Sequence, residues 1–189
     1  MACRLISIAC VAVIVGCAST GRSTRLTHGD FNDTVHAMAA SLATSDFITD
    51  RTSRSPPIRI VTNKVENLSS DVISPAEQWM LIARVQTANP VQELAQKKRI
   101  VFQIPPEEIV MLQNRGFEVG LAPENAPTHL MTATIMSSSR EGRDAREGIV
   151  NLRKDYYLIE FTIIELAGRE KVWTDAFEIA RQAAGLAID

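Results

Sequence analysis

Hydrophobic residues near the start of the chain recur with the spacing of one helical face. Successive members are separated by four, three, one and three positions, which is typical of an amphipathic helix. Asp30 directly precedes them, and we expect it to be the N-cap because its carboxylate can accept hydrogen bonds from the first turn. The hydrophobic positions are Phe31, Val35, Met38, Ala39 and Leu42.

Capping signals predict further helices in the middle of the chain. Ser74 and Glu77 have the spacing of a capping box, and the proline between them suits the first helical position because it has no backbone N–H to leave unpaired. We expect Asn89-Pro90 to break this helix before it resumes. A pair of prolines followed by a pair of glutamates predicts another helix over residues 105–116.

Five segments rich in aliphatic, β-branched or aromatic residues predict strands. Residues 156–166 are apolar at odd and even positions alike, which predicts a strand in the middle of a sheet with cover on both faces. We therefore expect an α+β fold with a central sheet of four to five strands flanked by helices. The predicted strands are 58–61, 100–104, 129–137, 156–166 and 171–180.

The overall composition is that of one globular domain. The chain has 189 residues, of which 46% are hydrophobic, enough to form one core and too few residues for two comfortable domains. The formal net charge is −2. A weakly acidic chain has no electrostatic reason to bind nucleic acid or anionic lipid headgroups.

All three cysteines lie within the first seventeen residues. The body of the protein therefore has no thiol nucleophile, disulfide or thiolate metal site. Arg4 and the apolar run 5–15 have the organisation of a signal peptide, and the run is too short to span a bilayer as a helix. An ordinary secretory signal in which Cys17 is incidental is the alternative to the lipoprotein signal described next.

The residues 14–17, Ile-Val-Gly-Cys, resemble the lipobox of bacterial lipoproteins. This resemblance implies cleavage before Cys17, addition of diacylglycerol to its thiol and a further acyl chain such as palmitate on its amino group. Ala18 in place of aspartate after the cysteine favours the outer membrane over retention in the inner membrane. We thus expect residues 1–16 to be a signal peptide, 17–27 a lipidated cysteine with a short flexible tether, and 28–189 a single α+β domain.

Candidate chemistry in the body of the chain is sparse. The three histidines, His28, His36 and His129, have no second His or Cys at metal-ligand spacing. Glu107-Glu108 is an acidic pair, but its place at a helix start favours a capping role over acid–base chemistry. We expect no enzymatic activity, no metal and no cofactor.

The polar insert over residues 138–152 is the best candidate contact surface, and a solvated mobile hairpin loop is the alternative. Trp79 is a candidate anchor for a partner, although core packing is favoured, and Trp173 is expected in the core. The candidate partner-binding residues are Arg140, Arg143, Arg146 and Arg153.

Several segments, in this order, resemble the LpoB-like outer-membrane lipoproteins that activate penicillin-binding proteins. The first resembles the opening helix of that family, the second its first strand and following turn, and the third its closing hairpin with a strand tryptophan. The segments are 30–42, 57–69 and 157–179.

The resemblance implies a non-catalytic, monomeric lipoprotein on the periplasmic face of the outer membrane. It implies a fold shared with the amino-terminal domain of TolB, and a partner that is a penicillin-binding protein, a peptidoglycan synthase. The alternative is an accessory subunit of an envelope secretion or transport complex related to the curli secretion lipoprotein. A pore is not expected, because no pair of segments alternates as membrane-crossing hairpins do.

Overall fold

The computed structural model describes residues 23–63, 65–103, 105, 110, 114, 126–144 and 150–184. The predictions for the signal peptide and Cys17 lie outside the described residues. So does most of the helix predicted over residues 105–116.

The first helix, α1 (His28–Thr44), begins earlier than its hydrophobic stripe. Its N-cap is Thr27, not Asp30 as predicted. Asp30 instead occupies the third helical position, where its carboxylate accepts from the backbone N–H of Thr27 at 2.6 Å. The Thr27 hydroxyl oxygen accepts in turn from the backbone N–H of Asp30, so the two residues close a capping box.

The second and third helices follow the predicted signals. Helix α2 (Pro75–Thr87) starts with the predicted capping box of Ser74 and Glu77 and has its proline in the first turn. Ala88 separates it from α3 (Asn89–Lys98), which confirms the break at Asn89-Pro90. Arg99 has a left-handed backbone with φ of 57°, and this conformation ends α3 before the next strand.

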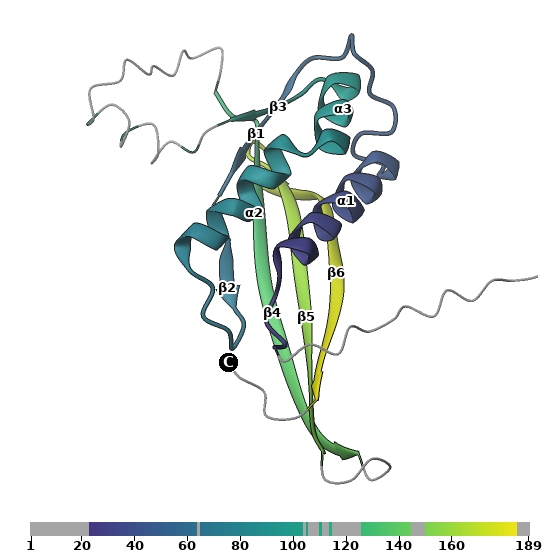
Figure 1. Cartoon of the computed structure of the whole chain (residues 1–189). Helices are drawn as coiled ribbons and strands as arrows, with labels where there is room; N and C mark the ends of the chain where they lie inside the picture. Colours follow the sequence, from purple (N-terminus) through teal and green to yellow (C-terminus); the bar gives the residue numbers. More distant parts are fainter. Residues whose placement is uncertain are drawn as a thin grey trace, which may run out of the picture.

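The sheet is mixed and has six strands. Three long antiparallel strands lie at one side, and two short strands run parallel to one another at the other side; β2 pairs in parallel with β4 off the main path. The order is β3-β1-β4-β5-β6 (Figure 1). The predicted α+β class is confirmed. The strands are β1 (Ile58–Thr62), β2 (Glu66–Leu68), β3 (Ile100–Gln103), β4 (His129–Asp144), β5 (Val150–Glu165) and β6 (Glu170–Ala184).

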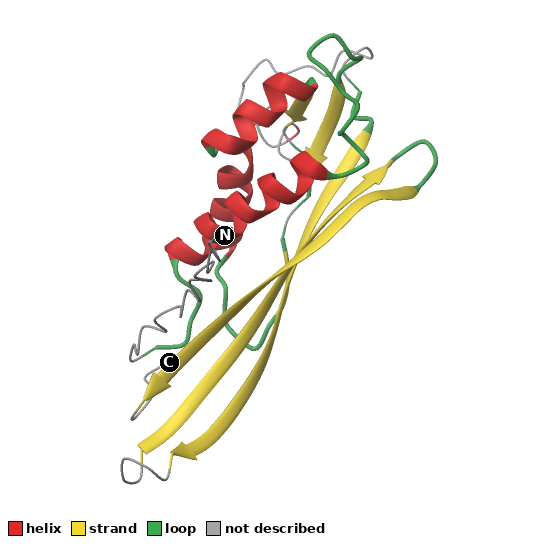
Figure 2. Cartoon of the chain, turned by 90° about the vertical axis from the view of Figure 1, so that its right-hand side faces the viewer, coloured by secondary structure: helices red, strands yellow, loops and turns green. Residues whose placement is uncertain are grey.

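Strands β4 and β5 extend much further than the sequence predicted. The segment 138–152 was expected to be a polar insert, but β4 continues to Asp144 and β5 begins at Val150. These residues pair in register down to Asp144 with Val150. The long strands therefore project beyond the helices (Figures 1 and 2).

The hydrophobic core lies between the three helices and one face of the sheet. Figure 2 shows all three helices on the same side. The odd-numbered residues from 129 to 135 on β4 and from 155 to 163 on β5 face them and are buried, whereas Leu158 and Ile164 on the even side stay partly exposed. As predicted, β5 lies inside the sheet, between β4 and β6. Of the cover expected on both faces of residues 156–166, the described helices supply only that on the odd-numbered face. The largest core side chains include Met38, Leu42, Leu81, Ile135, Ile159 and Phe161.

Residues 23–27 pack on the sheet, unlike the flexible tether predicted for them. Thr24 is 1% exposed, and its hydroxyl donates to the carboxylate of Asp155 on β5 at 2.5 Å. Arg181 on β6 donates to the Thr27 hydroxyl at 2.7 Å and pairs with Asp30 at 2.5 Å. We call residues 23–27 the strap, because they fasten the start of the domain to β5 and β6.

Candidate functional site

The candidate site is the face of the sheet turned away from the helices. Strand pairing aligns its side chains in rows, because directly paired residues point to the same side of a sheet. Leu68, Met136, Leu158 and Glu178 form one row across four strands. We call this surface the open face. Its residues are Glu66 and Leu68 of β2; Thr134, Met136, Ser138 and Arg140 of β4; Lys154, Tyr156, Leu158 and Glu160 of β5; and Ala176, Glu178, Ala180 and Gln182 of β6.

The middle of the open face is apolar. Leu68 is 58% exposed and Tyr156 is 42% exposed, and both are large hydrophobic side chains on the same face of the sheet. Met136 and Leu158 lie between them in the strand register. A groove of about 470 Å³ runs over this centre, lined by Met136, Ser138, Arg140, Tyr156, Leu158 and Glu178 among others.

Charged side chains lie at the two ends of this apolar centre and differ in sign. Arg140 and Lys154 are paired neighbours toward the tip of the long strands. Glu160 lies six positions further along β5, beyond the apolar rows, and Glu178 pairs with Leu158. The open face thus has a basic end and an acidic end, separated by Tyr156 and Leu158.

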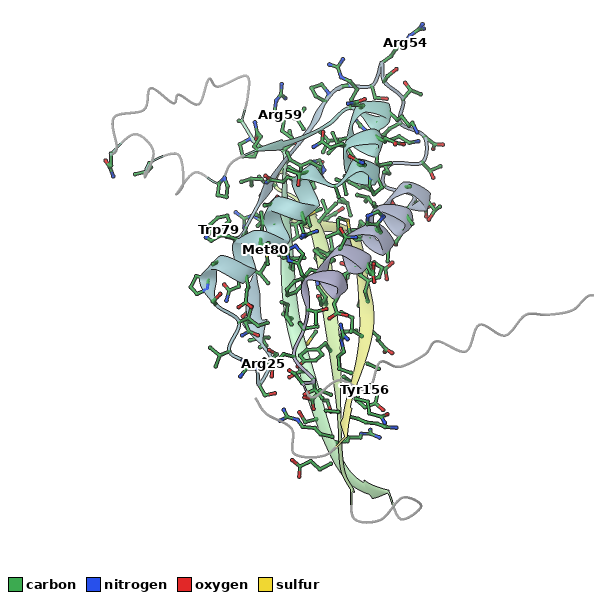
Figure 3. All side chains as sticks on the ribbon, in the orientation of Figure 1. Arg25, Arg54, Arg59, Trp79, Met80 and Tyr156 are labelled. Carbon is green, nitrogen blue, oxygen red and sulfur yellow. The ribbon has the colours of Figure 1, made fainter. Side chains whose placement is uncertain are left out.

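Arg140 is held against the aromatic ring of the site. Its guanidinium carbon lies 5.9 Å from the centre of the Tyr156 ring, a cation–π geometry. Among the described residues, no ion pair involves Arg140. Arg140 is exposed, so an acidic group from another molecule can reach its charge. Figure 3 shows Tyr156 on the projecting part of the sheet, and Arg54 at the opposite end of the domain.

The loop that follows β2, which includes Ser70 and Asp71, is hydrogen-bonded to β4 and β5 behind the open face. Tyr157 is buried on the helix side, and its hydroxyl donates to the carboxylate of Asp71. Burial, together with the hydrogen bond to Asp71 and its negative charge, raises the pKa of Tyr157, so the phenol stays protonated. The backbone N–H of Ser70 donates to the Ser137 hydroxyl at 2.9 Å. This loop thereby joins β2 to β4 and holds Leu68 beside Met136.

The predicted arginine cluster does not lie on one surface. Arg140 lies on the open face, whereas Arg153 lies on the helix side and pairs with Asp155 at 3.0 Å. The backbone of Arg143 belongs to β4, but its side chain lies outside the described part, as does all of Arg146. Of the two arginines whose side chains are described, only Arg140 is placed to meet a partner on the open face.

Sequence reasoning missed the apolar part of the site. The sequence predicts that Leu158 is buried beneath cover on the second face of the sheet, and it does not indicate Met136 or Tyr156 as contact residues. Their period-two spacing did place them on one face of the predicted strands. What the sequence could not supply was that the described helices all lie on the other face.

The two tryptophans, His28 and His129 pack against other residues of the domain and lie away from the groove. Trp173 is buried in the core, as predicted, and Trp79 is partly buried against it. His129 is buried beside Phe47, with ring centres 5.2 Å apart, and burial lowers its pKa despite the nearby Glu165. His28 contacts Arg84 of α2. Thus neither His28 nor His129 faces the groove.

The described residues, taken together, offer neither a metal site nor a membrane-spanning helix. In these parts of the chain, no group of three or more His, Cys, Asp or Glu side chains could hold a metal ion. None of the helices among them is long and apolar enough to cross a bilayer.

No protein-family model matches the sequence, and no curated protein matches it. Solved structures do show similarity. The C-terminal domain of LpoB from Escherichia coli is 10% identical, with a TM-score of 0.47, over 79% of this chain and 98% of that domain. The same domain from Salmonella enterica is 8% identical, with a TM-score of 0.44, over the same shares.

A lipoprotein from Neisseria meningitidis is 13% identical, with a TM-score of 0.41, over 67% of this chain and 84% of that chain. These likenesses concern the arrangement of helices and strands. The LpoB-like resemblance in the sequence therefore stays a prediction about function.

Proposed function

We propose that this protein is a non-catalytic lipoprotein that binds and regulates a peptidoglycan synthase, a penicillin-binding protein, through its open face. The observation that carries the proposal is the apolar cluster of exposed Tyr156 and Leu68 with half-buried Leu158 and Met136 between them, and with Arg140 at its edge. The order of segments resembling the LpoB-like family supports the choice of partner.

The composition of the open face suits protein binding. Aromatic residues, methionine and arginine are enriched where proteins meet, and charged residues surround an apolar centre in such interfaces. Tyr156 offers a large rigid surface, and Arg140 offers a fixed charge beside it. A partner with an apolar projection and an acidic neighbour would fit this pattern.

The site of action follows from the lipobox. Lipid on Cys17 would hold the protein on a membrane, because each buried methylene contributes about 0.8 kcal/mol. Ala18 after the cysteine favours the periplasmic face of the outer membrane. The strap begins its contacts at Thr24. The seven residues from Cys17 can span at most about 25 Å when fully extended. The domain would therefore stay near its membrane, and a synthase of the inner membrane would have to reach toward it.

The proposal is tested by crosslinking in intact membranes, followed by identification of the captured proteins. Wild type is compared with Cys17→Ala, which removes the acceptor for lipid. Recovery of a penicillin-binding protein with wild type, reduced in the variant, is the expected result. Recovery of secretion components alone would contradict the proposal and favour the accessory-subunit alternative.

A further inference from the structure

We propose that two copies of this protein associate with their open faces together, around a twofold axis that crosses the strands at right angles. This inference rests on the charge pattern of the open face and does not depend on the proposed synthase partner. It replaces the monomer expected from the sequence with a reversible dimer.

The charges along β5 are self-complementary under this symmetry. The axis passes between Tyr156 and Leu158. It places β5 of the second copy on top of β5 of the first, with the strand running in the opposite direction. Lys154 of each copy then lies opposite Glu160 of the other, and Tyr156 lies opposite Leu158. Both pairs form twice, as in any twofold interface between identical surfaces.

The alternative twofold axis, parallel to the strands, is disfavoured. It would place each row opposite the same row, so Arg140 and Lys154 would meet basic residues of the other copy. Like charges brought together in an interface are unfavourable. Two twisted sheets can pack face to face with their strands nearly aligned, at a separation of about 10 Å, so the favoured arrangement is sterically ordinary.

The association is expected to be weak in solution and stronger on a membrane. Four rows of β4, β5 and β6, with the two rows of β2, cover on the order of 400 Å² of sheet per copy, from standard strand spacings. Stable complexes bury about 1,200–2,000 Å² in total, so this contact, with about 800 Å² in total, falls below their range. Anchoring both copies in one membrane would raise their effective concentration. A partner that binds the open face would compete with the dimer.

Thiol crosslinking can test this geometry in the full-length chain. The sequence has no cysteine after Cys17, so an introduced cysteine is unique in the domain. In the proposed dimer the two copies of Ser138 lie close to the axis, about 12 Å apart, whereas the two copies of Lys154 lie more than about 20 Å apart.

We therefore expect the following result with a short bismaleimide in isolated membranes. Ser138→Cys gives a crosslinked dimer, and Lys154→Cys or Glu160→Cys alone gives none. The double variant Lys154→Cys, Glu160→Cys gives a dimer, because the thiol at position 154 of one copy faces the thiol at position 160 of the other. Dimers from Lys154→Cys alone, or none from Ser138→Cys and the double variant, would overturn the proposal.

A charge exchange gives a second and independent readout. Within one molecule Lys154 and Glu160 are six residues apart on β5, about 20 Å, and cannot contact one another. In the Ser138→Cys background, Lys154→Glu or Glu160→Lys should each reduce crosslinking severalfold. Combining the two should restore it, which also shows that the exchanged protein folds. No restoration in the combined variant would contradict the assigned register. If wild type dimerises as proposed but binds no penicillin-binding protein, the result counts against the proposed function alone.

Discussion

The guanidinium carbon of Arg140 lies 5.9 Å from the centre of the Tyr156 ring. The two residues come from neighbouring strands, β4 and β5, and both belong to the exposed even-numbered positions of these strands. The contact of the Arg140 guanidinium with the exposed Tyr156 ring connects the basic end of the open face to its apolar centre. This arrangement explains how a polar segment of the sequence and an apolar one form a single surface.

The strap should contribute to the stability of the domain. Thr24→Val keeps the shape of the side chain but removes the hydroxyl that donates to buried Asp155. We expect the free energy of unfolding to fall by about 1–3 kcal/mol, the usual cost of leaving a buried polar group without its partner. Urea denaturation measures the change. Thr49→Val, at an exposed turn position, is the matched control; equal stability of the two variants would show that the Thr24 hydroxyl adds nothing.

The same contact should make stability depend on pH. Burial works to raise the pKa of Asp155, but hydrogen bonds from Thr24, Arg153 and Ser139 and the charge of Arg153 outweigh it, so the pKa is lowered. A lowered folded-state pKa means that the carboxylate stabilises the fold above its unfolded pKa of about 4 and that this contribution is lost as pH falls through the folded-state pKa.

Asp155→Asn should therefore lose less stability than wild type when the pH is lowered from about 5 to about 2, although it starts from a lower value. Thermal unfolding at a series of pH values measures this difference. Asp46→Asn, which removes an exposed carboxylate, is the control. Parallel pH curves for Asp155→Asn and wild type would contradict the assignment.

The loop behind the open face depends on Tyr157. Tyr157→Phe removes the hydroxyl that donates to Asp71, and we expect a loss of about 1–3 kcal/mol because the acceptor is charged. Hydrogen exchange at the backbone N–H of Ser70 should also become faster. The neighbouring change Tyr156→Phe is the control, since it alters an exposed ring on the other side of the same strand. Similar effects of both changes would show that Asp71 does not hold the loop.

Local signals in the sequence were sufficient for the helices. The capping box of Ser74 and Glu77 and the break at Asn89-Pro90 act through backbone groups close in sequence, so they could be recognised without the fold. The predicted start of α1 is wrong because Thr27 and Asp30 form a capping box together. Only Asp30 is adjacent to the hydrophobic stripe, so the sequence indicated Asp30 as the N-cap in place of Thr27.

The long hairpin could not be predicted from local pattern. Ser138, Ser139 and Arg140 are ordinary loop residues by propensity, yet they form a strand because each pairs with a residue of β5. Strand formation of this kind depends on the neighbouring strand more than on the residues themselves. The ion pair of half-buried Arg153 and buried Asp155 likewise joins residues that precede the predicted strand 156–166, so their shared face could not be recognised.

The open face was hidden for a different reason. An apolar residue such as Leu158 has the same sequence signature whether it is covered by a second layer or exposed for binding. Only the placement of all three described helices on the other side separates the two cases. An exposed apolar patch in a folded domain is then a sign of interaction.

The most direct test of the central claim is the affinity of the protein for the synthase recovered by membrane crosslinking. Binding is measured for wild type, Arg140→Ala and Arg54→Ala, which remove the same side chain from the open face and from the loop at the other end of the domain. We predict that Arg140→Ala weakens binding about tenfold or more, as expected for an interface arginine, and that Arg54→Ala leaves it unchanged. Equal affinity of all three proteins would contradict the assignment of the open face as the binding surface.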